Sequence, residues 1–284
     1  MTETNWLKYA QEPKYWLLAI AAGLISLQLT LASRTNDIDS FGTMFMFWGI
    51  VAFLIWEKQE NLKLESGIFA SFFGITIIAL ILLKSSSISG YDVFIRISPL
   101  LSGLSLGILA SGIKGLKQYW QELIVLAYLI IPPGLIGVFV DVSLLTAKSS
   151  AFILHYVGFN VIRQGIYLRL PNGSIEVYHG CSGVHAILQL LGLAIVFLLM
   201  FPTTRNQKII VPIVAVIVAF FVNSARIALL AVLVSLSQPE AFKYWHQGNG
   251  SVVFSMISVA VFGLFCWFFI LREQEQQNKE KQNS

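Results

Sequence analysis

The sequence predicts an all-α integral membrane protein with about eight transmembrane helices. Of its 284 residues, 56% are apolar and only 12% are charged, whereas a soluble domain carries about 25% charged residues. The apolar residues gather in long runs, and about 20 residues are enough for a helix to cross a bilayer. A soluble fold is therefore excluded. Intrinsic disorder is also excluded, because it requires low hydrophobicity and high charge. A net charge of only +4 does not favour nucleic acid as a partner.

Eight apolar runs are separated by polar or charged joints. They are residues 15–33, 41–56, 66–83, 94–113, 121–140, 181–201, 209–236 and 250–271. The second run is short, and we expect its helix to extend into the flanks. Pro132 and Pro133 predict a kink in the fifth run. Gly103 and Gly107 form a GxxxG pair in the fourth run, which favours close packing of two helices.

The positive charges predict the orientation of these helices. Eleven Lys and Arg residues fall at joints on one side, seven fall on the other, and Arg226 completes the 19. Because Lys and Arg are enriched on the cytoplasmic side, we expect both termini to be cytoplasmic. The predicted division is an N-terminal bundle of about five helices (1–140), an extracytoplasmic segment (141–180), a three-helix part (181–271) and a cytoplasmic polar tail (272–284).

The connection at 141–180 is long enough to have structure of its own. Residues 144–162 are predicted to form a helix along the membrane interface, anchored by aromatic side chains. Residues 165–180 partly alternate apolar and polar side chains around Asn172-Gly173, a strong hairpin turn signal. A short β-hairpin is therefore expected to lead directly into the sixth apolar run.

Arg226 lies deep in the seventh run, where insertion of an arginine costs about 2.5–3.5 kcal/mol. The run contains no acidic residue that could pair with it. Charged residues inside a membrane are usually functional, although a structural contact with helix-end carbonyls is the alternative. Asn223 stands one turn earlier on the same helix face. It could hold the guanidinium or share its role in binding a substrate.

Cys181 is one of two cysteines and stands in the sequence HGCSG, where the predicted hairpin becomes a helix. The positive end of a helix favours a thiolate, and small neighbours allow a substrate backbone to approach closely. The alternative is a small residue in a tight turn. Cys266 lies in a smooth apolar run and is predicted to be inert packing. Two cysteines are too few for a disulfide framework.

His246 stands just before the eighth run, and a histidine can serve as acid and base near pH 7. An interfacial aromatic-belt residue is the alternative. His179 and His185 are rival histidines near Cys181. The three residues could form a metal cluster, but no fourth ligand is apparent, so no metal and no cofactor are predicted.

The predicted topology brings Cys181, Arg226 and His246 to one depth at the extracytoplasmic face. The imidazole would activate the thiol, the cysteine would attack a carbonyl, and the guanidinium would stabilise an oxyanion or thiolate. The predicted chemistry is acyl transfer.

At these residues the sequence resembles the exosortase/archaeosortase family. The resemblance rests on GCSG at 180–183, NSAR at 223–226 and His246. The stretch YVGFNVIRQGIYLRLPNGSIEVYHGCSG, 156–183, is most similar to the cyanobacterial branch, the cyanoexosortases, with type A as the expected subtype. The resemblance is specific over roughly residues 150–260, and the first 140 residues match only as a bundle of spanning helices.

The resemblance implies a membrane cysteine peptidase or transpeptidase of the plasma (inner) membrane. Its substrates would be exported proteins with a C-terminal sorting signal, namely a Pro-Glu-Pro motif, one spanning helix and a basic tail (PEP-CTERM). Cys181 would be the nucleophile, Arg226 the stabiliser of the oxyanion or thiolate, and His246 the general acid and base. The acceptor stays open among water, a glycan and a lipid. Substrates would enter sideways from the lipid bilayer beside the last three apolar runs.

Three other functions remain compatible with the sequence. A transporter or channel would use Arg226 as a substrate or ion site, although we find no internal repeat of the kind that transporters often show. A membrane scaffold would explain neither the hairpin before Cys181 nor the buried arginine. A membrane acyltransferase would differ only in its substrate.

Overall fold

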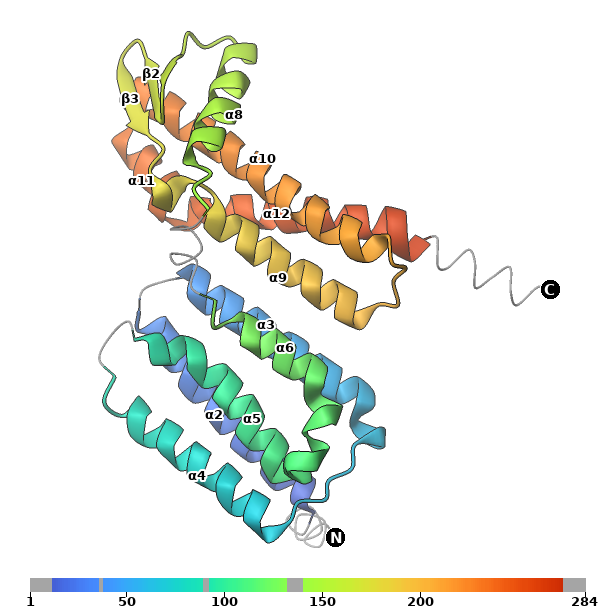
Figure 1. Ribbon diagram of the computed structural model, residues 1–284. Coiled ribbons are helices and arrows are strands. Elements are labelled where there is room, and N and C mark those ends of the chain that lie inside the picture. The colour runs from blue at the N-terminus through green and yellow to red at the C-terminus, as the bar shows by residue number, and fades with distance from the viewer. Residues whose placement is uncertain (1–11, 36–37, 89–91, 132–139, 273–284) are drawn as a thin grey trace, which may run out of the picture. The chain divides into compact units, whose positions relative to one another are not determined.

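The computed structural model describes residues 12–35, 38–88, 92–131 and 140–272. The chain divides into two compact units, Met1–Ile131 and Pro132–Ser284, and each is described by itself. Both units are built mainly of helices, and the second also contains a small sheet (Figure 1).

Unit 1 is a bundle of apolar helices. Its α-helices are α2 (Pro13–Ser33), α3 (Ile38–Lys58), α4 (Ile68–Ser85), α5 (Val93–Gly115) and α6 (Trp120–Tyr128). Short 3-10 turns follow α3 and α5, at Gln59–Asn61 and Leu116–Tyr119. Helix α5 packs against α2, α4 and α6, and its buried face is rich in serine and glycine. Small side chains on α5 therefore allow three neighbours to approach it closely.

Buried polar contacts join the helices of unit 1. Gln28 of α2 donates to the Ser98 carbonyl oxygen at 3.1 Å and accepts from the Trp48 indole at 3.0 Å. Lys58 of α3 pairs with the buried Glu122 of α6 at 2.7 Å. Because polar groups need partners in an apolar interior, these contacts fix which helices lie next to one another.

Seven stretches of the described residues are long and apolar enough to cross a membrane, rather than the predicted eight. The fourth predicted run and the start of the fifth form one apolar stretch, Val93–Tyr128, within which the chain turns between α5 and α6. Gly112 provides a kink with φ of +68°, and α6 has nine residues, about half of what a spanning helix needs. The predicted kink at Pro132 and Pro133 lies outside the described residues. The second run does extend into its flanks, as Ile38–Lys58.

Unit 2 is organised around one long helix, α10 (Gln207–Ser235). It packs against the other α-helices described in this unit, namely α8 (Ser143–Tyr156), α9 (Val184–Met200), α11 (Pro239–Gln247) and α12 (Asn249–Cys266). A 3-10 turn, η3 (His179–Cys181), precedes α9, and a π-helical turn, Trp267–Leu271, follows α12. Figure 1 shows α8 and the sheet gathered at one end of α10.

The segment at 141–180 contains a helix followed by a three-stranded sheet. The strands β1 (Ile162–Gln164), β2 (Tyr167–Leu170) and β3 (Gly173–Glu176) are antiparallel in the order β1-β2-β3. Leu170 pairs with Gly173, so the turn residues are Pro171 and Asn172, one position earlier than the predicted Asn172-Gly173. The strand β1 was not predicted, because three exposed residues have no visible alternation.

The sheet packs on α8 and α10 through the inward side chains of β2. Leu168 and Leu170 of β2 are buried in one cluster with Leu154 of α8 and Ile227 and Leu230 of α10. Burial of a leucine side chain contributes about 1.5–3 kcal/mol. The sheet and α8 are therefore firmly packed on α10, next to the point where the chain reaches Cys181.

We predict that valine at Gly103 loosens unit 1. A Cβ atom at Gly103 would stand 2.4 Å from Leu126 Cδ1 of α6, a side chain that is fully buried and must shift to make room. Overpacking of this kind lowers the free energy of unfolding by about 1–3 kcal/mol. The measurement is thermal unfolding of Gly103→Val in detergent.

Gly23→Val is the matched control for this substitution, because nothing lies within 4 Å of a Cβ atom at Gly23. Both variants introduce the same β-branched residue into an apolar helix. Equal melting temperatures for the two variants would contradict the close packing of α5 against α6.

Candidate active site

Cys181 lies in a tight turn between the sheet and α9. Its N–H donates to the Tyr178 carbonyl oxygen at 2.9 Å, and the N–H of Ser182 donates to that of His179 at 3.2 Å. The turn then closes at Gly183, whose φ of +99° is strained for any residue with a side chain. This glycine allows α9 to begin immediately afterwards, and it explains why the sequence has a glycine two residues after the cysteine.

Three side-chain hydrogen bonds join this turn, α8 and α10 to one another. Asn223 donates to the Cys181 carbonyl oxygen at 3.2 Å, and Thr146 donates to the Ser182 carbonyl oxygen at 2.7 Å. Ser150 of α8 donates to the Ser224 carbonyl oxygen of α10 at 2.8 Å. Each bond joins elements that are far apart in sequence and lies in a buried region. The backbone around Cys181 is therefore held in a single position.

Asn223 thus holds the cysteine turn rather than the guanidinium of Arg226. Its side chain is buried and packs against Gly183, where a Cβ atom would stand only 2.6 Å from Asn223 Nδ2. We had expected Asn223 to contact a substrate or Arg226. The hydrogen bond to Cys181 gives this residue a positioning contact that sequence spacing alone did not reveal.

The thiol of Cys181 meets the imidazole of His246. Cys181 Sγ lies 3.2 Å from His246 Nε2, and the cysteine is only 5% exposed. The histidine is on α11, a short helix that starts at Pro239, and its ring stacks on Phe242 with ring centroids 5.1 Å apart. Partial burial, and then the positive charge of Arg226, lower the pKa of His246 below its usual value. The imidazole is therefore neutral at pH 7 and able to accept a proton from the thiol.

Arg226 supplies the positive charge of the site. It follows Asn223 by three residues on α10, which places the two on neighbouring positions of one helix face. Within the described part of the chain, its Nε atom is buried and has no hydrogen-bond partner. A buried donor without a partner costs about 1–3 kcal/mol. Such a donor is suited to an anion that is present only during a reaction.

Tyr178 also belongs to this cluster, although the sequence analysis did not single it out. Its carbonyl oxygen accepts the Cys181 N–H at 2.9 Å, and its ring lies against Gly180. Tyrosines are common at membrane interfaces, so a tyrosine at the end of a predicted hairpin does not by itself indicate a site residue. The only available signal was its position three residues before Cys181, where a turn brings the two together.

The other candidate residues lie apart from this pair. His179 Nδ1 is 4.0 Å from Asp141, and His185 is half-buried in the first turn of α9. In the part of the chain that the structure covers, no three His, Cys, Asp or Glu residues are grouped to hold a metal ion. Cys266 lies in a second buried cluster with Leu190 and Phe262, separate from the cluster that contains Cys181.

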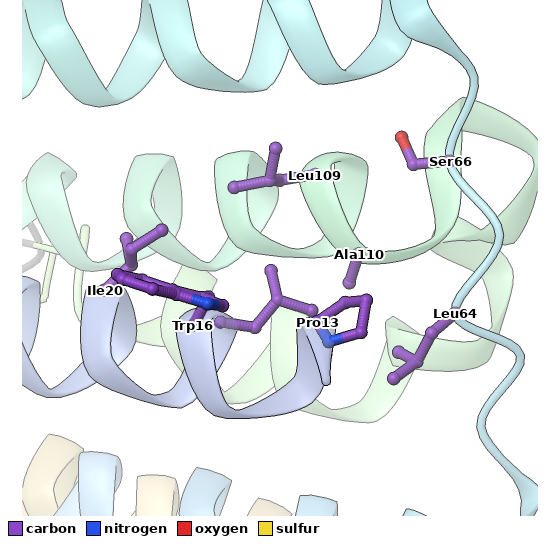
Figure 2. A pocket seen from close by; sticks show the side chains of 8 residues that line it. Pro13, Trp16, Ile20, Leu64, Ser66, Leu109 and Ala110 are labelled. Atoms are coloured by element: carbon purple, nitrogen blue, oxygen red, sulfur yellow. The ribbon is translucent and has the colours of Figure 1, made fainter. Parts of the chain in front are cut away.

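Unit 1 has a cavity of about 460 Å³, but its lining has no acid, base or thiol. Figure 2 shows Trp16, Ile20 and Leu109 around it, with Ser66 as the one side chain that carries an oxygen. A cavity with this lining offers no group for acyl-transfer chemistry.

Comparison with known proteins agrees with the resemblance found in the sequence. The profile of a family described as Transmembrane exosortase (Exosortase_EpsH) matches residues 33–263. The chain belongs to the transmembrane exosortase family. The matched region of this exosortase-family chain contains Tyr178, Cys181, Asn223, Arg226 and His246.

A curated relative extends the comparison to archaea. Probable archaeosortase E of Methanocaldococcus jannaschii is 32% identical over 97 residues, which is 34% of this chain and 50% of the relative. The chain therefore matches half the length of that relative. No solved structure matches the exosortase-family chain.

We predict that alanine at Gly183 disturbs Cys181 more than the backbone strain alone would. The substitution forces an L side chain into positive φ and drives its Cβ atom against Asn223. The Asn223 hydrogen bond to Cys181 should be lost, and strain of this kind costs about 1–3 kcal/mol. The rate of alkylation of Cys181 by iodoacetamide, measured in a Cys266→Ala background, should change severalfold.

Gly165→Ala provides the control. Gly165 also has positive φ, at +62°, but nothing lies within 4 Å of its added Cβ atom. It should leave the alkylation rate of Cys181 unchanged. A Gly183→Ala variant that reacts at the same rate as Gly165→Ala would show that the contact with Asn223 does not hold the cysteine.

Proposed function

We propose that this exosortase-family protein is a membrane cysteine endopeptidase or transpeptidase that cleaves C-terminal sorting signals. The observation that carries the proposal is the 3.2 Å separation of Cys181 Sγ and His246 Nε2 at a partly buried site next to Arg226. A thiol within hydrogen-bonding distance of a neutral imidazole is the usual arrangement for nucleophilic catalysis.

The reaction begins with proton transfer from Cys181 Sγ to His246 Nε2. The thiolate attacks the carbonyl carbon of the scissile peptide bond, and a C–S bond forms as the carbonyl oxygen becomes an oxyanion. Arg226, with its unpartnered Nε–H, stabilises that negative charge. The tetrahedral intermediate collapses, the C–N bond breaks, and His246 gives its proton to the leaving amine.

The remaining thioester joins Cys181 to the N-terminal part of the substrate. An acceptor nucleophile, either water or an amine or hydroxyl of a glycan or lipid, loses a proton to His246 and attacks the thioester. The new bond releases the processed protein and restores the thiol. Water would give hydrolysis, whereas a glycan or lipid acceptor would give transpeptidation or transesterification.

The substrates we propose are exported membrane proteins with a Pro-Glu-Pro motif, a spanning helix and a basic tail. The family resemblance supports this choice. The proposed orientation has both termini in the cytoplasm and Cys181 at the extracytoplasmic face of the plasma (inner) membrane, as the Lys and Arg counts predict. The substrate helix would enter from the bilayer beside α9, α10 and α12. The stretch at 156–183 supports placing the chain in the cyanobacterial branch, type A.

Substrate processing in cells tests the roles of Cys181 and His246. A reporter that carries a Pro-Glu-Pro motif, a spanning helix and a basic tail should be shortened by the wild type. Cys181→Ala should give no detectable processing, because the acyl-enzyme cannot form. His246→Ala should lose about 10²–10⁴-fold in rate, as expected for loss of a general acid and base. The measurement is the reporter mass on a gel and by mass spectrometry.

Cys266→Ala is the matched control, because it removes the second thiol from a packed cluster away from Cys181. It should process the reporter at the wild-type rate. Normal processing by Cys181→Ala would disprove the nucleophile assignment. Transport of a labelled solute into vesicles, unaffected by Cys181→Ala, would instead support the transporter or channel, with Arg226 as its ion or substrate site.

The pH dependence of the reaction tests the protonation state of His246. Burial and the Arg226 charge both disfavour the protonated imidazole, so the pKa of His246 is lowered. The base form is then present at neutral pH and is lost only as the pH falls below the usual histidine value of about 6.5. The acid limb of kcat/KM for the reporter should have its midpoint below that value.

Arg226→Gln and Arg226→Lys separate the two causes of this lowered pKa. Arg226→Gln removes the charge, so the acid limb of the residual activity should move to higher pH. Arg226→Lys keeps the charge and should leave the limb near the wild-type position. An acid limb that lies above pH 6.5 in the wild type would contradict a neutral His246 as the base.

A further inference from the structure

Tyr178 is placed beside the reacting sulfur by the turn that holds Cys181. Its carbonyl oxygen accepts the Cys181 N–H at 2.9 Å, and its backbone is extended, with φ of −76° and ψ of 171°. The chain therefore reverses direction between the two residues. The turn brings the tyrosine and the cysteine together regardless of how the rest of the sheet is arranged.

Gly180 allows the tyrosine ring to fold back over this turn. A Cβ atom at Gly180 would stand 2.6 Å from Tyr178 Cε2 and 3.4 Å from Cδ2 and Cζ. The ring therefore occupies the space that any side chain at position 180 would fill. The position of the Tyr178 ring therefore requires a glycine at position 180, directly before Cys181. A substrate that approaches the cysteine could require a small residue there as well.

The phenol faces the same charges as the catalytic pair. The pKa of Tyr178 is raised, first by its hydrogen bond and charge interaction with the Cys181 sulfur and then by burial, while Arg226 acts in the opposite sense. A raised pKa keeps the hydroxyl protonated at neutral pH. The hydroxyl can then donate a hydrogen bond to the sulfur at neutral pH. His246, which lies on the sulfur as well, accepts the thiol proton.

We propose that Tyr178 is a further catalytic residue, whose hydroxyl donates a hydrogen bond to the Cys181 sulfur and stabilises the thiolate. The proposal rests on Cys181 being the nucleophile. In the first step the proton moves from Cys181 Sγ to His246 Nε2, and Tyr178 keeps its own proton throughout. When the sulfur becomes neutral in the thioester, the same hydroxyl is free to return to solvent, since the side chain is 49% exposed.

The experiment measures the thiol directly and needs no substrate. The full-length protein with Cys266→Ala has Cys181 as its one thiol, and its alkylation by iodoacetamide is followed from pH 5 to pH 10. A hydrogen bond to a charged group is worth about 1.5–3 kcal/mol, and one pKa unit corresponds to about 1.4 kcal/mol. Tyr178→Phe should therefore move the midpoint of the alkylation profile to higher pH by about one unit or more.

Tyr167→Phe is the matched control, because it removes the same hydroxyl from an exposed position on β2. Its profile should superimpose on that of the parent. A Tyr178→Phe profile that also superimposes on the parent would overturn the proposal. Thermal unfolding of each variant in the same detergent shows that the compared proteins are folded.

Gly180→Ala tests the position of the ring without touching the hydroxyl. It should displace Tyr178 and move the midpoint in the same direction. If both variants act through one hydrogen bond, Gly180→Ala combined with Tyr178→Phe should shift the midpoint no further than Tyr178→Phe alone. Fully additive shifts would overturn the assigned role of Gly180. A reporter that Cys181→Ala still processes would defeat the proposed function, whereas the alkylation shift would stand.

Discussion

A short polar stretch inside the apolar helix α10 sets the arrangement of unit 2. Asn223, Ser224 and Arg226 occur within three turns that are otherwise apolar, and polar groups in such surroundings need partners. The turn at 179–183 and the helix α8 supply them: Asn223 bonds to the turn, and the Ser224 carbonyl accepts from Ser150. The third group differs, because the buried Nε of Arg226 has no hydrogen-bond partner among the residues that the structure describes. The packing that satisfies Asn223 and Ser224 therefore also places the Cys181 turn on the part of α10 that contains Arg226.

The two units use buried polar groups in different ways. In unit 1 they pair with each other, as Gln28 does with Trp48 and Lys58 does with Glu122, and these contacts specify which helices are neighbours. In unit 2 the pairs hold a backbone turn and leave Cys181, His246 and Arg226 free to react. Burial of polar groups inside a membrane costs free energy, because groups without a protein partner cannot form hydrogen bonds with water there.

Sequence reasoning selects residues that conflict with their surroundings, and it misses contacts that depend on local turns. Arg226 and Cys181 stand out because a charge and a thiol interrupt apolar runs, and the spans at α9, α10 and α12 follow from length and hydropathy. The break predicted between 113 and 121 agrees with the turn between α5 and α6, but the count of eight spans is not confirmed, because α6 has only nine residues. The nine-residue α11 was missed because it is too short and polar to show a clear period. The contact of Tyr178 with Cys181 depends on the turn geometry at Gly180, which no pattern of residue types reveals.

The central claim is that the substrate becomes covalently attached to Cys181, and intact-protein mass spectrometry tests it most directly. The purified protein in nanodiscs would be mixed with the reporter and quenched with acid within its first turnover. The account predicts an adduct equal in mass to the N-terminal part of the reporter, released by hydroxylamine as a thioester requires and absent from Cys181→Ala. Peptide mapping should place it on the segment that contains Cys181 and not on that of Cys266. Cleavage of the reporter without any adduct at Cys181, under conditions where the product accumulates, would contradict the account.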